Sequence, residues 1–162
     1  MTSTPIAHPT KASRPARFRR WATIAAIAVL ALAGATAFMA WRMSYVPSGL
    51  DYGTTRPTAA GHFTVSYVPS QDPVPVNRLH QWTLSVTTPD GKPVQGASIS
   101  VDGDMPQHGH GLPTRPAVTE DLGNGRYLVD GVKFQMGGWW VMDFEVRASG
   151  KADSVRFNLL LK

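Results

Sequence analysis

One segment of the sequence, residues 102 to 116, gathers side chains that can bind a soft metal ion. It reads DGDMPQHGHGLPTRP and holds Met105, His108 and His110 in the spacing M-x-x-H-x-H. In extended backbone, His108 and His110 would project to the same side, so that both imidazoles reach one ion about 2 Å from each nitrogen. The thioether of Met105 is a soft ligand that favours Cu(I) over zinc or magnesium. The segment therefore predicts a copper site, with Cu(I) preferred over Cu(II).

A second segment, FQMGGWW from Phe134 to Trp140, adds Met136 beside two glycines that allow close approach of the backbone. Two histidines and two methionines offer only neutral ligands, which suits Cu(I) and makes binding depend on histidine protonation. Each residue also has a simpler interpretation, because a histidine in a Gly/Pro loop is usually solvated and a lone methionine usually fills a gap in a core. The coincidence of Met105, His108 and His110 in one irregular segment favours the metal site.

The sequence lacks the groups that commonly carry catalysis. It has no cysteine, which excludes disulfides, thiolate nucleophiles and Cys-zinc sites. It also has no G-x-S-x-G motif and no evident carboxylate pair, and we interpret Asp102 and Asp104 as caps of the candidate loop or as partners of a ligating histidine. We therefore expect a protein that binds and transfers a metal, without catalytic residues.

The positive charge of the chain lies at its amino terminus. The formal net charge of +5 is carried by five residues, Lys11, Arg14, Arg17, Arg19 and Arg20. From Trp21 onward the basic and acidic residues balance at eleven each. A neutral domain lacks the clustered positive field that phosphate binding needs, so the composition argues against a nucleic-acid partner.

The amino-terminal part has the pattern of a membrane anchor. A basic stretch, residues 1–20, precedes an apolar stretch, residues 21–42, whose uncharged part at about 1.5 Å per residue reaches about 30 Å, the thickness of the hydrocarbon layer. The charge asymmetry predicts a cytoplasmic amino terminus and a periplasmic carboxy-terminal domain. A cleaved signal peptide is the alternative, and it delivers the domain to the same compartment. Residues 43–61, rich in Pro, Gly, Ser and Thr, predict a linker.

Residues 62–162 alternate apolar and polar side chains in one short segment after another. Trp82, Leu84 and Val86 share one face of such a segment, and Gly/Pro turns separate the segments. This pattern predicts an all-β domain, an antiparallel immunoglobulin- or cupredoxin-like sandwich of about seven strands. Residues 102–116 interrupt the alternation, and their Pro and Gly content predicts a long loop that is neither strand nor helix. His62 and His80, which begin strands, are interpreted as surface or structural residues.

The order of several motifs resembles the YtkA-like family, which is related to FixH-type proteins. The resemblance spans roughly residues 80 to 147, and its motifs are M-P-x-H-x-H-G from Met105, P-T-x-P-x-V from Pro113 and G-x-Y-x-V-x-G-x-x-F-x-M-x-G-x-W from Gly125. It implies an extracytoplasmic β-sandwich linked to copper handling, with Met105, His108, His110 and Met136 as the ligands.

The predicted function is that of a membrane-tethered periplasmic copper carrier or chaperone. We expect it to act in copper homeostasis or in copper-oxidase maturation, with copper as the cofactor. The expected partners are the copper ion, the inner membrane and a copper-receiving membrane protein or oxidase. The alternative is an accessory or adhesion-type sandwich subunit of a membrane complex that binds no metal, in which both histidines could be replaced without loss of function.

Overall fold

The computed structural model describes residues 16–162 and contains two units, divided between Ser44 and Tyr45. The first unit contains the helix α1 (Ala16–Ser44). Its span Arg17–Ser44 has a mean hydropathy of 2.1 over its most apolar window, which by length and composition is enough to cross a membrane. A signal sequence has the same properties, so the length and composition of this helix suit a membrane anchor and a signal segment alike. Lys11 and Arg14, which belong to the basic stretch predicted to be cytoplasmic, lie outside the described residues.

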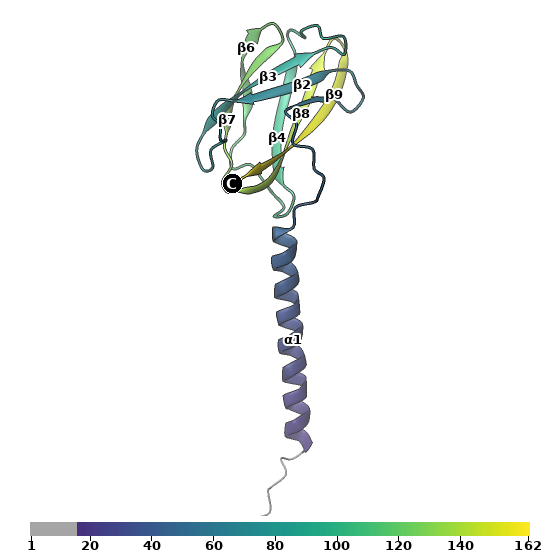
Figure 1. Ribbon diagram of the computed structural model, residues 1–162, viewed down its shortest axis with the longest axis vertical. Coiled ribbons are helices and arrows are strands. Elements are labelled where there is room, and N and C mark those ends of the chain that lie inside the picture. Colours follow the sequence, from purple (N-terminus) through teal and green to yellow (C-terminus); the bar gives the residue numbers. More distant parts are fainter. Residues whose placement is uncertain (1–15) are drawn as a thin grey trace, which may run out of the picture. The chain divides into compact units, whose positions relative to one another are not determined.

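The second unit is built from nine strands in two antiparallel sheets, among residues 45–162 (Figure 1). One sheet has the order β1 (Thr55–Pro57), β2 (Thr64–Pro69), β3 (His80–Thr87), β7 (Arg126–Val132) and β6 (Ala117–Gly123). The other has the order β5 (His110–Gly111), β4 (Ser98–Met105), β8 (Gly138–Ala148) and β9 (Lys151–Leu161). The predicted antiparallel sandwich is confirmed, and the short strands β1 and β5 exceed the predicted number.

The core lies between the two sheets and follows the alternation in the sequence. Trp82, Leu84 and Val86 of β3 are fully buried, whereas the residues between them are only half-buried. The ring of Tyr67 stacks on Trp82 with centroids 4.4 Å apart. It also makes an edge-to-face contact with Phe157, which belongs to the other sheet, at a centroid distance of 5.0 Å. Because these aromatic side chains bury large apolar areas, they supply much of the free energy that holds the sheets together.

The β unit begins earlier than the sequence predicted. Residues 45–61, expected as a linker, include β1, and the backbone N–H of Ala59 donates to Ser154 O of β9 at 2.8 Å. Thr58, at 3% exposure, is part of the buried interior. This segment shows no apolar alternation because polar hydrogen bonds, not a buried apolar face, attach it to the sandwich.

Asp153 of β9 is the centre of that attachment, which we call the Asp153 clamp (residues 58–62 and Asp153). The Asp153 carboxylate accepts hydrogen bonds from Thr58 Oγ1 at 2.6 Å and from the backbone N–H groups of Ala60 and His62 at 3.0 and 3.2 Å. Burial disfavours the ionised carboxyl, but these bonds and one from Ser154 N–H outweigh it and hold the pKa of Asp153 well below its usual value. The carboxylate is therefore a fully partnered structural group.

Candidate metal centre

The candidate ligand segment is a hairpin in the structure. β4 continues to Met105, a turn covers residues 106–109, and β5 returns with His110 directly opposite Met105. The backbone N–H groups of His108 and Gly109 both donate to Met105 O at 2.9 Å. The prediction that residues 102–116 contain no strand was therefore wrong, because backbone hydrogen bonds hold the chain in strand geometry on both sides of the turn despite its Pro and Gly content.

The hairpin brings the side chains of Met105 and His110 to the same face. Residues directly opposite each other on antiparallel strands have Cβ atoms about 5 Å apart and share a face of the sheet. The Met105 side chain is 1% exposed, and its methyl carbon lies so close to Gly138 that a Cβ atom there would stand 2.4 Å away. Gly138 thus makes the space that the end of the Met105 side chain fills.

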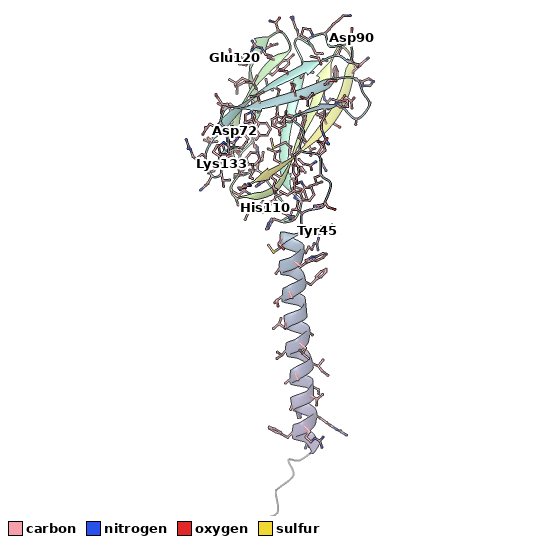
Figure 2. All side chains as sticks on the ribbon, viewed as in Figure 1. Tyr45, Asp72, Asp90, His110, Glu120 and Lys133 are labelled. Carbon is pink, nitrogen blue, oxygen red and sulfur yellow. The ribbon has the colours of Figure 1, made fainter. Side chains whose placement is uncertain are left out.

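His108 and His110 lie close together at the end of the β4–β5 hairpin. We call Met105, His108 and His110 the rim. His108 belongs to the turn rather than to extended backbone. Their ring centroids are 5.6 Å apart with an interplanar angle of 31°. The His110 ring also lies 6.1 Å from the ring of the buried Trp140. Figure 2 labels His110 at the end of the sandwich where Tyr45 begins the β unit. Gln107 of the same turn donates a side-chain hydrogen bond to Tyr45 O, which fastens the hairpin at this end.

A comparison with protein-family models matches residues 59–145 to the YtkA-like family. The chain belongs to the YtkA-like family. The matched region begins earlier than the resemblance found in the sequence and contains all four candidate ligands. None of the curated proteins compared with the sequence matches it.

One solved structure resembles the YtkA-like fold of this chain. It is the crystal structure of a DUF4426 family protein from Pseudomonas aeruginosa PAO1, with 18% sequence identity and a TM-score of 0.48. The alignment covers 67% of this chain and 96% of that chain. This similarity carries no information about the function of the present protein.

Met136, the fourth candidate ligand, lies on the segment that leads into β8 of the YtkA-like region. Its side chain is 39% exposed. Its backbone carbonyl accepts a hydrogen bond from Trp140 Nε1 at 3.0 Å, so the ring beside His110 is held by the Met136 backbone. The segment of Met136 therefore borders the same rim as His110.

The sequence pattern gave no reason to choose Gln135, yet the structure places it at the centre of the rim. Gln135 Nε2 lies 2.9 Å from His110 Nδ1 and donates to Gly111 O at 3.3 Å. Gln135 Oε1 is buried and has no hydrogen-bond partner among residues 16–162. An unpartnered buried carbonyl is costly, and four other side-chain atoms of residues 16–162 share this state, among them His80 Nε2 and Trp82 Nε1 in the core. What distinguishes Gln135 Oε1 is that its amide contacts the candidate ligand His110.

No carboxylate takes part in this cluster. Among residues 16–162, no three side chains of His, Cys, Asp or Glu are grouped as a metal site would require. A metal at the rim would therefore depend on thioether sulfur in addition to imidazole. Asp102, predicted to cap the loop, accepts a hydrogen bond at 2.8 Å from the backbone N–H of Gly103.

His80 is a structural residue, one of the two roles predicted for it. It is 4% exposed and lies between the rings of Trp82 and Phe134, at 6.4 and 5.7 Å. Burial lowers the pKa of His80, and the nearby carbonyl of Arg78, 3.2 Å from Nδ1, partly offsets that effect. A neutral imidazole packed among aromatic rings serves the core.

Proposed function

We propose that this protein is a membrane-tethered periplasmic copper carrier, which holds Cu(I) at the rim formed by Met105, His108 and His110. The observation that carries the proposal is the β4–β5 hairpin, whose register sets Met105 opposite His110 and whose turn brings His108 to 5.6 Å from His110. A soft thioether and two imidazoles are the donor set that Cu(I) favours in the absence of cysteine.

The spacing of the two rings fits one shared ion. Imidazole nitrogen binds a metal at about 2 Å, which puts the ion about 3 Å from the ring centroid, so two rings that share an ion have centroids up to about 6 Å apart. The observed 5.6 Å between His108 and His110 lies within that limit. Met136, exposed on the adjoining segment, is suited to act as the outermost ligand, which a receiving protein can displace first.

Gln135 supports a metal-binding form of His110. Rotation of its amide would exchange Nε2 and Oε1, after which Oε1 accepts from His110 Nδ1–H at the cost of the weaker bond to Gly111. The proton on Nδ1 would leave His110 Nε2 free to bind copper, because each neutral imidazole carries a single proton. The same rotation would give Oε1 the partner that it lacks, and it would move Nε2 into the buried position that now holds the unpartnered Oε1.

The half-buried imidazoles, the exposed Met136 and the candidate anchor support the carrier role. Ligand exchange makes and breaks only metal–ligand bonds, so the proposal needs no catalytic group. The helix α1 would tether the protein to the inner membrane as a single pass, with the β unit in the periplasm according to the charge asymmetry of the sequence. Copper homeostasis or the maturation of a copper oxidase is the process in which we place the carrier.

The test is a Cu(I) competition titration against a chromogenic chelator, on the full chain in detergent. The His108→Ala/His110→Ala double variant should bind Cu(I) at least 100-fold more weakly than the unmodified chain. His62→Ala, which removes a histidine beside Asp153, serves as the matched control and should leave the affinity unchanged. Equal affinity of the unmodified chain and the double variant would instead favour the accessory or adhesion-type role.

A further inference from the structure

The carboxyl-terminal strand β9 forms one edge of the four-stranded sheet and is only partly covered. Its pairing with β8 runs without a register shift from Lys151 to Leu161, so its backbone groups point alternately toward β8 and away from it. Ser154 O accepts from Ala59 N–H, and Arg156 O accepts from the Arg56 guanidinium, both at 2.8 Å. These contacts come from outside the sheet and cover the first half of the edge.

The edge is open at Leu160. Asn158, the outward residue before it, is 9% exposed, and its side-chain amide donates to Asp51 O at 3.0 Å, so residue 51 lies against the strand there. By the same alternation, the N–H and C=O of Leu160 also point away from β8. Among residues 16–162, no group outside the sheet forms a hydrogen bond with the Leu160 backbone. The Leu160 side chain is 51% exposed. An edge with free backbone groups is a template for another strand.

A groove of about 1020 Å³ lies beside this open edge. Its apolar walls come from both sheets and from the loop between β2 and β3, and they include Tyr52, Tyr67, Val74, Val76, Leu159 and Leu161. The Tyr67 ring is held against Trp82 and Phe157, so this wall is a rigid part of the core. A strand added to β9 would have apolar space for its alternate side chains, which is the arrangement of β-strand addition.

The charges around the groove favour an acidic occupant. Arg78 and Lys162 border it, with Asp72 as the only acidic lining residue in this part of the chain. Within residues 16–162, neither Arg78 nor Lys162 forms an ion pair. Two unpaired cations beside a single acidic residue on the lining of an apolar groove complement a carboxylate that flanks an apolar segment.

We propose that this groove binds an extended peptide segment of a partner protein, apolar at alternate positions and acidic at one end, as an added strand on β9. A second copy of the chain fits less well. Residues 56 and 59 already cover the first half of β9, and two copies paired through the remainder would bring the cations Arg78 and Lys162 of both into one short interface. An acidic segment meets neither obstacle.

The groove adjoins residues 134–137, the segment that carries the candidate ligand Met136. A Cβ atom on Gly137 would lie 3.2 Å from Leu161 O, and the backbone N–H of Asn77 donates to Phe134 O at 2.6 Å. Both walls of the groove therefore border residues 134–137, which include Gln135 and Met136. A partner seated there would lie beside the rim, but binding of the peptide does not depend on copper.

The test uses a display library of random ten-residue peptides, selected on the metal-free full chain in lipid nanodiscs after removal of peptides that bind empty nanodiscs. Selected peptides should alternate apolar residues and carry Asp or Glu near one end. Leu160→Pro removes the outward N–H without breaking a bond to β8, and it should weaken their binding at least 10-fold. Leu160→Ala keeps that N–H and should change binding by less than about 3-fold, which separates backbone pairing from side-chain contact.

Reversal of the charges sharpens the result. Arg78→Glu/Lys162→Glu should weaken binding of the acidic peptides at least 10-fold, whereas Arg126→Glu, on the exposed face of β7, should not. The proposal is overturned if no peptide is enriched, if the selected peptides bind Leu160→Pro as well as the unmodified chain, or if they are basic. Self-association that Leu160→Pro abolishes would also overturn it in favour of a second copy.

Discussion

The two ends of the β8–β9 pair differ in how their central polar side chains are hydrogen-bonded. At one end, the Asp153 clamp fastens residues 58–62, and the carboxylate is fully hydrogen-bonded. At the other end, where Gly138 pairs with Leu161, the rim holds two half-buried imidazoles and the unpartnered Oε1 of Gln135. Both ends combine a loop, buried strands and polar side chains. At the first end the central carboxylate is satisfied within the protein, although the buried His62 Nδ1, 3.6 Å from Asp153 Oδ2, forms no hydrogen bond among residues 16–162. At the second end the unpartnered atom belongs to Gln135, which contacts the candidate ligand His110.

This difference separates stability from binding. A satisfied buried network contributes to the free energy of folding and leaves nothing for a ligand. A rim with an unpaired acceptor and two adjacent imidazoles gains from a ligand that completes it. Variants of the clamp carboxylate should therefore change stability and spare copper binding, whereas variants of the polar side chains at the rim should weaken copper binding with little effect on stability.

The largest effect on stability is expected from Asp153→Ala. The change leaves the N–H groups of Ala60 and His62 without their acceptor and removes one of the two acceptors of Thr58 Oγ1, so the attachment of the segment to β9 should loosen. We expect the Tm of the β unit to fall by on the order of 10 °C in circular dichroism melts. Cu(I) affinity at low temperature should be unchanged. A large loss of copper affinity with an intact fold would contradict the separation of the two ends.

Gly138→Ala should disturb the rim from within the core. The new Cβ would stand 2.4 Å from the Met105 methyl carbon, at a backbone φ of 124°. We expect the free energy of unfolding to fall by about 1–3 kcal/mol, and displacement of the thioether to weaken Cu(I) binding.

Two further variants separate backbone strain from the clash with Met105 as causes of the effects of Gly138→Ala. Gly150→Ala, at a φ of 73° with open space around it, carries backbone strain without a clash and should leave copper binding intact. Met105→Ala should relieve the clash, so chemical denaturation of the double variant Met105→Ala/Gly138→Ala should show less than additive destabilisation. Full additivity would show that Gly138 does not act through Met105.

Gln135→Leu should weaken copper binding with little effect on stability. The amide is the hydrogen-bond partner of His110 Nδ1, and loss of such a partner typically costs 10–100-fold in metal affinity. Because leucine also removes the unpartnered Oε1, the Tm should stay the same or rise slightly. The exposed Gln81→Leu is the control. Unchanged Cu(I) affinity of Gln135→Leu in the chelator titration would remove Gln135 from the site.

The smallest predicted effect is an acid limit set by the clamp. Because the pKa of Asp153 is lowered in the folded state, its contribution to stability is complete above the unfolded pKa of about 4 and is lost as pH falls below that value. Urea denaturation at pH 7 and pH 3 should therefore show a smaller pH dependence for Asp153→Asn than for the unmodified chain. An identical pH dependence would mean that the carboxylate contributes no net stability as an ion.

The strands were predictable where apolar alternation decides burial. Trp82, Leu84 and Val86 fill the core as their spacing indicates. β1 and β5 were missed because they are short and rely on backbone or polar contacts, which leave no apolar period. The Pro and Gly content that predicted a loop after Val101 marks the turn at residues 106–109 and the irregular segment 112–116, whereas β4 continues to Met105 and β5 lies between the two.

The sequence could predict the types of the candidate ligands but not the residues that contact them and fix their positions. The spacing of Met105, His108 and His110 singled out their segment, but the sequence predicted a loop there and not the hairpin that the structure shows. Gln135 and Gly138 act through tertiary contacts with His110 and Met105, about 25 to 33 positions away, and no local pattern encodes such a contact. Their proximity to Met136 in sequence was the one available signal.

X-ray absorption at the copper edge shows whether Met105, His108 and His110 bind one Cu(I). On the full chain loaded with one equivalent of Cu(I), we expect two nitrogen neighbours at about 2 Å and at least one sulfur neighbour at about 2.3 Å. The sulfur signal should decrease in Met105→Leu, and the nitrogen signal should decrease in the His108→Ala/His110→Ala variant. A first shell of oxygen and nitrogen alone, unchanged in these variants, would contradict the copper site.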